Sequence, residues 1–86
     1  MNIQIELMAF IRRPDGLPRI FERVIDESIT ISQFLKDLGF KLDEIRLMQC
    51  FISKITDKDN NERVQRSYAL KDGDYLFITL PIGGGI

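Results

Sequence analysis

The residues best suited to chemistry are three consecutive glycines, Gly83 to Gly85, near the end of this 86-residue sequence. Glycine has no side chain to bury and loses the most backbone freedom on ordering, so a glycine run adds little to a core. We expect a flexible arm that enters a narrow site on another protein, with the C-terminal carboxyl group as the reactive centre. Ile86 follows Gly85 and places a branched side chain beyond the run.

Few other groups could carry catalysis. The sequence has no histidine, which removes the commonest general base and metal ligand. Its single cysteine, Cys50, excludes a disulfide within the chain and is expected in the core, where free cysteine is usually found. No phosphate-binding glycine loop is present. We therefore expect a protein that is not an enzyme and that needs neither a cofactor nor a metal.

The amino-acid composition limits the classes of protein to which the chain can belong. Hydrophobic residues make up 44% of the chain and charged residues 29%, which suits one small domain with a soluble surface. The net charge of −1 gives no electrostatic reason to expect nucleic acid or an anionic membrane as a partner. No apolar run approaches the roughly 18–20 residues of a membrane span, and no signal peptide is visible. The absence of a visible membrane span or signal peptide, together with the single cysteine, predicts a cytoplasmic protein.

The apolar pattern predicts a hairpin followed by a helix. Residues 3–11 alternate as a strand, and residues 19–25 return after a turn signalled by Pro-Asp-Gly. The inward face of the first strand would carry Ile3, Ile5, Leu7, Ala9 and Ile11. Residues 31–38 have an apolar helical stripe, with Thr30 as N-cap, Gln33 completing a capping box and Gly39 ending the helix.

Two further strands are expected, over residues 46–55 and 75–80, separated by a polar loop at 57–63 and a tight turn at 70–74. Pro81 marks the end of the last strand because it cannot donate to a ladder. This order predicts an α+β fold of the β-grasp (ubiquitin-like) type, a mixed sheet with one helix packed across one face. Its first and last strands would lie side by side and parallel. The domain would span residues 1–80, and residues 81–86 would form a flexible glycine tail.

Four apolar side chains fall on the face of the predicted sheet that points away from the helix. Together they would form an interface patch close to the tail, since contiguous exposed apolar side chains usually mark a binding surface. Curling of the strand ends, which would bury the rings, is the alternative. The four residues are Met8, Phe10, Phe51 and Phe77.

The segment from Leu70 to Gly85 resembles the ubiquitin-related sulfur carriers, namely the small subunit of molybdopterin synthase (MoaD-like) and the thiamin-pathway sulfur carrier (ThiS-like), and the whole chain is similar to them in the order of its elements. The shared pattern is Leu70, the turn Asp72-Gly73-Asp74, an apolar strand, Pro81 and the pair Gly84-Gly85. The segment TISQFLKDLG also resembles the family's short helix ending in Leu-Gly.

This resemblance implies that a ubiquitin-activating-enzyme-like adenylyltransferase adenylates the carboxylate of Gly85, after which sulfur displaces AMP to give a thiocarboxylate. Gly83 and Gly84 would provide clearance in the partner's channel, and Pro81 would begin the arm. A large synthase subunit would be a second partner, and a peptidase that trims Ile86 a third. The sulfur would serve cofactor biosynthesis of the molybdopterin or thiamin type. Two alternatives stay open: a protein modifier conjugated through Gly85, and a non-catalytic interaction module with an inert tail.

Overall fold

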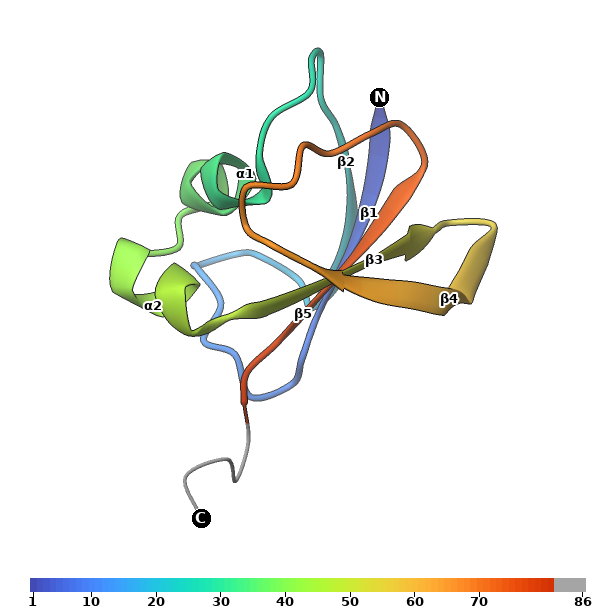
Figure 1. The fold of residues 1–86 in the computed structure, drawn as a ribbon. Helices are drawn as coiled ribbons and strands as arrows, with labels where there is room; N and C mark the ends of the chain where they lie inside the picture. The colour runs from blue at the N-terminus through green and yellow to red at the C-terminus, as the bar shows by residue number, and fades with distance from the viewer. Residues whose placement is uncertain (82–86) are drawn as a thin grey trace.

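The computed structural model describes residues 1–81, which form a five-stranded mixed sheet with two helices packed against one face (Figure 1). The strands lie in the order β2-β1-β5-β3-β4. The predicted α+β class is confirmed, and the order is compatible with a β-grasp-like fold. The prediction of one helix is wrong, because a second short helix follows the first. The elements are β1 (Asn2–Leu7), β2 (Ile20–Val24), α1 (Ile31–Leu38), α2 (Leu42–Leu47), β3 (Gln49–Lys54), β4 (Asp57–Val64) and β5 (Asp74–Thr79).

The centre of the sheet is β5, which pairs on both sides. It runs parallel to β1, as predicted for the first and last strands, with Leu7 opposite Ile78. It runs antiparallel to β3, with Gln49 opposite Thr79. The C-terminal end of β5 therefore lies between the end of β1 and the start of β3.

The core lies between this sheet and α1. Ile3, Ile5 and Leu7 of β1 are fully buried, as are Leu76 and Ile78 of β5. Each fully buried side chain of this kind contributes about 1.5–3 kcal/mol relative to an exposed one. They pack with the buried stripe of α1, which consists of Ile31, Phe34 and Leu35.

The predicted ends of α1 are confirmed. The Thr30 hydroxyl accepts a hydrogen bond from the Gln33 backbone N–H at 3.1 Å, and Gly39 takes the left-handed conformation with φ of 106°. The reciprocal half of the capping box is absent, because the Gln33 side-chain amide donates to Asp37 at 2.8 Å instead.

The second helix, α2, replaces the start of the strand predicted over residues 46–55. Arg46 and Leu47 belong to α2, and β3 begins only at Gln49. The carboxylate of Glu44 accepts from the Lys41 backbone N–H at 2.9 Å, which satisfies a free donor at the start of the helix. Only Ile45 of this helix is buried, so its apolar stripe is too short to be recognised in the sequence.

The segment predicted as a polar loop at 57–63 is instead the edge strand β4. It pairs antiparallel with β3, with Cys50 opposite Val64 and Ile52 opposite Glu62. Both faces of β4 are largely exposed, so backbone hydrogen bonds rather than buried side chains define it. Polar, charged edge strands are common because they discourage pairing with other chains.

The first strand ends earlier than predicted. β1 stops at Leu7, and the Ile11 backbone N–H turns back to the Met8 carbonyl oxygen at 3.1 Å. Ile11 is buried as expected, but Ala9 is exposed. Phe10 therefore follows the strand rather than lying on one of its faces.

Candidate functional site

The predicted reactive residues Gly84 and Gly85 lie outside the described residues, as do Gly83 and Ile86. The described chain reaches Pro81, which is exposed and comes two residues after the end of β5. The strand that leads to it is firmly held, because Leu76 and Ile78 are fully buried. In addition, the Met8 backbone N–H donates to the Ile78 carbonyl oxygen at 2.9 Å.

Two of the four predicted patch residues lie together. Phe51 on β3 is directly opposite Phe77 on β5, and their ring centroids are 6.4 Å apart with planes tilted by 39°. Both are half-buried, and neighbouring Cys50 and Ile78 point into the core. Because successive side chains alternate, the two rings lie on the sheet face opposite the helices. We call this surface the open face.

The other two patch residues lie elsewhere, so the prediction of four aligned side chains is wrong. Met8 is half-buried and packs against the core cluster. Phe10 is 77% exposed in the bend after β1. Since β1 and β5 are parallel, this bend lies at the end of the sheet from which Pro81 emerges. The sequence pattern failed here because the chain leaves the strand geometry before Phe10.

Leu47 is an exposed apolar residue that the sequence reasoning missed. It is the last residue of α2 and is 64% exposed. It comes two residues before Gln49, which pairs with Thr79 at the end of β5. Phe10 and Leu47 thus belong to the two chain segments that flank the exit of the last strand. Leu47 was missed because the sequence predicts a strand at this position, and the blurred alternation of that strand does not show which side chains are exposed.

The open face also carries a network of polar side chains beside the phenylalanines. The Tyr75 hydroxyl donates to a carboxylate oxygen of Glu6, and the Arg19 guanidinium lies 3.5 Å from the other oxygen. The Lys58 ammonium lies 4.9 Å from the centroid of the Tyr75 ring. Burial and the Glu6 carboxylate raise the pKa of Tyr75 to about 12, so its hydroxyl stays protonated and acts as a donor at neutral pH.

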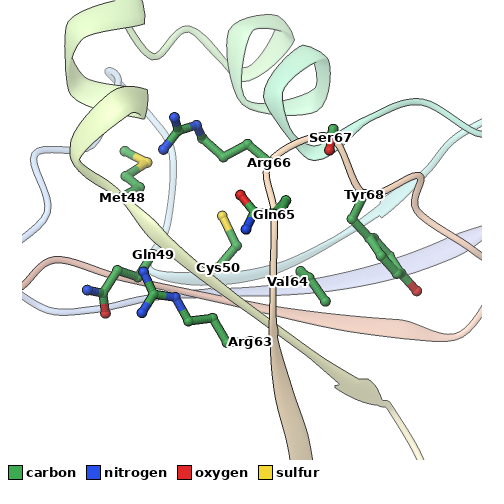
Figure 2. A pocket seen from close by; sticks show the side chains of 9 residues that line it. All are labelled: Met48, Gln49, Cys50, Arg63, Val64, Gln65, Arg66, Ser67 and Tyr68. Carbon is green, nitrogen blue, oxygen red and sulfur yellow. The ribbon is translucent and has the colours of Figure 1, made fainter.

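Cys50 lies in the core, as predicted, with 1% of its surface exposed. Burial raises the pKa of its thiol from 9.0 to about 11, although the positive charges of Arg66 and Arg63 act in the opposite direction. A protonated, buried thiol is a poor nucleophile. Cys50 is also one of the residues at a cavity of about 650 Å³, shown in Figure 2.

The described residues offer neither a metal centre nor a membrane span. Within residues 1–81, no group of three or more histidine, cysteine, aspartate or glutamate side chains is placed to hold a metal ion. No helix in this range combines the length and apolar character needed to cross a bilayer.

Comparison with known proteins gives no match: no family model, no curated protein and no solved structure is similar to this chain. The resemblance to sulfur carriers is therefore tested by none of these comparisons and stays a prediction from the sequence.

Proposed function

We propose that the chain is a β-grasp sulfur carrier whose Gly85 carboxyl group is adenylated by a ubiquitin-activating-enzyme-like partner and converted to a thiocarboxylate. The observation that carries the proposal is the position of β5, the central strand, which leads through exposed Pro81 toward the glycines. Ile82 to Gly85 can span at most roughly 13–14 Å when extended. A thin arm of this length suits a carboxyl group that must enter a partner's nucleotide site while the domain stays outside.

The open face supplies a surface on which such a partner can dock. Phe77 lies on β5 itself, and Phe51 lies opposite it on the neighbouring strand β3. Phe10 is exposed at the end of the sheet where β5 ends. Aromatic side chains are enriched at the centres of protein interfaces. Docking here would hold the arm toward the partner's active site, and a large synthase subunit would use the same surface in turn.

Removal of Ile86 by a peptidase is part of the proposal. The family reaction takes place at a terminal glycine, which corresponds to Gly85. A residue after Gly85 moves the carboxylate one position further along the channel, and the β-branched side chain adds bulk beside it. The proposal also places the protein in the cytoplasm, and it needs no cofactor bound to the carrier itself.

Incubation with ATP and an extract of the native cells tests this function. When the full chain is incubated, we expect intact-mass spectra to show that Ile86 is lost and that Gly85 carries a thiocarboxylate. A form made without Ile86 should gain the same thiocarboxylate. A form that also lacks Gly84 and Gly85 should stay unmodified, whereas Lys36→Ala, at an exposed position of α1, should react like the parent. Higher-mass covalent adducts would favour the protein modifier instead. If none of these forms is modified, the hypothesis that remains is the non-catalytic interaction module.

A further inference from the structure

The cavity of about 650 Å³ opens where β3 and β4 part (Figure 2). Pairing between these strands reaches Cys50 and Val64, whereas β3 continues to pair with β5 as far as Gln49. From Gln65 onward the chain leaves the sheet, so Gln49 at the start of β3 has no pairing partner on β4. We call this space the β3–β4 groove.

The outer wall of the β3–β4 groove is held in place by the start of α1. The Ser32 backbone N–H donates to the Arg66 carbonyl oxygen, and the Ile31 N–H donates to the Tyr68 carbonyl oxygen, both at 3.0 Å. These bonds tie the departing segment to a helix whose buried side chains belong to the core. The groove is therefore preformed.

Two arginines approach the groove from opposite sides of the sheet. Arg63 pairs with Phe51 and shares its side of the ladder, which is the open face. Arg66 donates to the Arg46 carbonyl oxygen at 3.1 Å, which places its guanidinium on the side of α2. Among residues 1–81, neither guanidinium has a carboxylate oxygen within 4.0 Å. Two positive charges thus border the groove without an acidic partner in the described chain.

We propose that the β3–β4 groove binds an extended peptide segment of a protein partner that carries two adjacent acidic residues. Successive side chains of an extended peptide point to opposite sides, so neighbouring carboxylates would meet Arg63 on one side and Arg66 on the other. Guanidinium–carboxylate hydrogen bonds are among the stronger polar contacts.

The shape of the charge distribution favours a peptide over a compact anion. A single phosphate cannot easily satisfy two guanidinium groups that come from opposite sides of a sheet, whereas two separate carboxylates can. Met48 and Val64 add apolar surface beside the charges. This inference stands apart from sulfur transfer, because it uses neither the glycines nor Phe77.

Amide chemical-shift titration of the full chain with short peptides tests the inference. The probes are the acetylated, amidated hexapeptides TVEEVT and TEVEVT, which have the same composition and differ only in glutamate spacing. We expect saturable shifts at Gln49, Cys50 and residues 63–67 with TVEEVT. TEVEVT should bind about fivefold or more weakly, because both of its carboxylates face one side. This comparison uses the unaltered protein, so no folding defect can affect it.

Variants test the arginines themselves. Arg63→Gln with Arg66→Gln should weaken TVEEVT binding by about tenfold or more, since two charge-assisted contacts are lost. The control is Arg23→Gln with Lys36→Gln, which changes the net charge equally at exposed positions on β2 and α1, and should bind like the parent. Arg63→Gln alone, at an exposed position, should also weaken binding without altering the fold.

Three results would overturn the inference. The first is equal binding of the two hexapeptides. The second is unchanged affinity in the arginine variants. The third is an equally tight response of the same amides to inorganic phosphate, which would make the groove a site for small anions.

Discussion

Phe51 and Phe77 lie opposite each other across the β3–β5 ladder, with ring centroids 6.4 Å apart, on the side of the sheet that carries no helix. Their exposure is only partial, yet they are the aromatic residues of the open face nearest the end of β5. Such a pair is suited to be the centre of an interface, where a few aromatic side chains supply most of the binding energy.

Replacing either phenylalanine should therefore slow activation by the adenylating partner. For Phe51→Ala or Phe77→Ala we expect the ATP-dependent reaction at limiting partner concentration to fall by about tenfold, the effect of losing roughly 1.4 kcal/mol of binding. The matched control is Ile20→Ala, an exposed apolar residue on edge strand β2 of the same face. An unchanged rate in both phenylalanine variants, with normal melting temperatures, would exclude the pair from docking.

The ion pair between Arg12 and Glu44 joins the loop after β1 to α2. Arg12 donates to both oxygens of Glu44, at 2.6 and 2.7 Å, and the Lys41 backbone N–H donates a third bond. These bonds lower the pKa of Glu44 from 4.5 to about 2. The folded chain therefore binds fewer protons here than the unfolded chain, and the pair stabilises the fold above pH 4.5 but loses this effect as the pH falls toward 2.

Glu44→Gln should reveal this pH dependence. Near pH 6 we expect a loss of about 1 kcal/mol in the free energy of unfolding, a modest value because the pair is at the surface. The difference between parent and variant should shrink between pH 4.5 and 2. Urea unfolding at several pH values measures it. A difference that stays constant down to pH 2 would contradict the assigned pKa.

Alanine substitutions at two glycines with positive φ distinguish the cost of backbone strain from the cost of steric crowding. Gly39 has φ of 106°, and an added Cβ would lie 3.2 Å from Cβ of Pro14. Gly73 has φ of 84°, and nothing lies within 4 Å of an added Cβ. Gly73→Ala should cost about 1 kcal/mol from conformation alone, and Gly39→Ala about 2–3 kcal/mol, since it adds a steric contact. Equal losses in thermal unfolding would show that Pro14 moves aside freely.

Cys50 should be nearly inert in the folded protein. With a pKa of about 11 rather than 9.0, its thiolate fraction at pH 8 is roughly a hundredfold lower, and burial limits access further. Reaction with a disulfide reagent should therefore be at least about a hundredfold slower in buffer than in 6 M guanidinium chloride. Fast reaction of the native protein would indicate that the thiol is open to the β3–β4 groove.

Much of the fold could be predicted because its central strands have clear patterns. Ile3, Ile5 and Leu7 alternate, Leu76 and Ile78 do the same, and the helix carries a complete apolar stripe between Thr30 and Gly39. These elements bury the core, so hydrophobic periodicity records them directly.

The elements that were missed bury little. β4 is almost wholly exposed and is defined by backbone pairing, while α2 buries only Ile45. The groove depends on where β4 leaves the sheet, so the sequence could not show that Arg63 and Arg66 border the same groove. Phe10 was placed on the wrong surface because the apolar alternation continues to Ile11, whereas the chain already turns between Met8 and Ile11. Local patterns do not contain such information.

The intact mass of the protein purified from its native cells tests the central claim most directly. The proposal predicts a chain that ends at Gly85, with one carboxylate oxygen replaced by sulfur in part of the population. The chain with Ile86 still attached and no sulfur added, unchanged after incubation with ATP and the cell extract, would contradict a sulfur carrier.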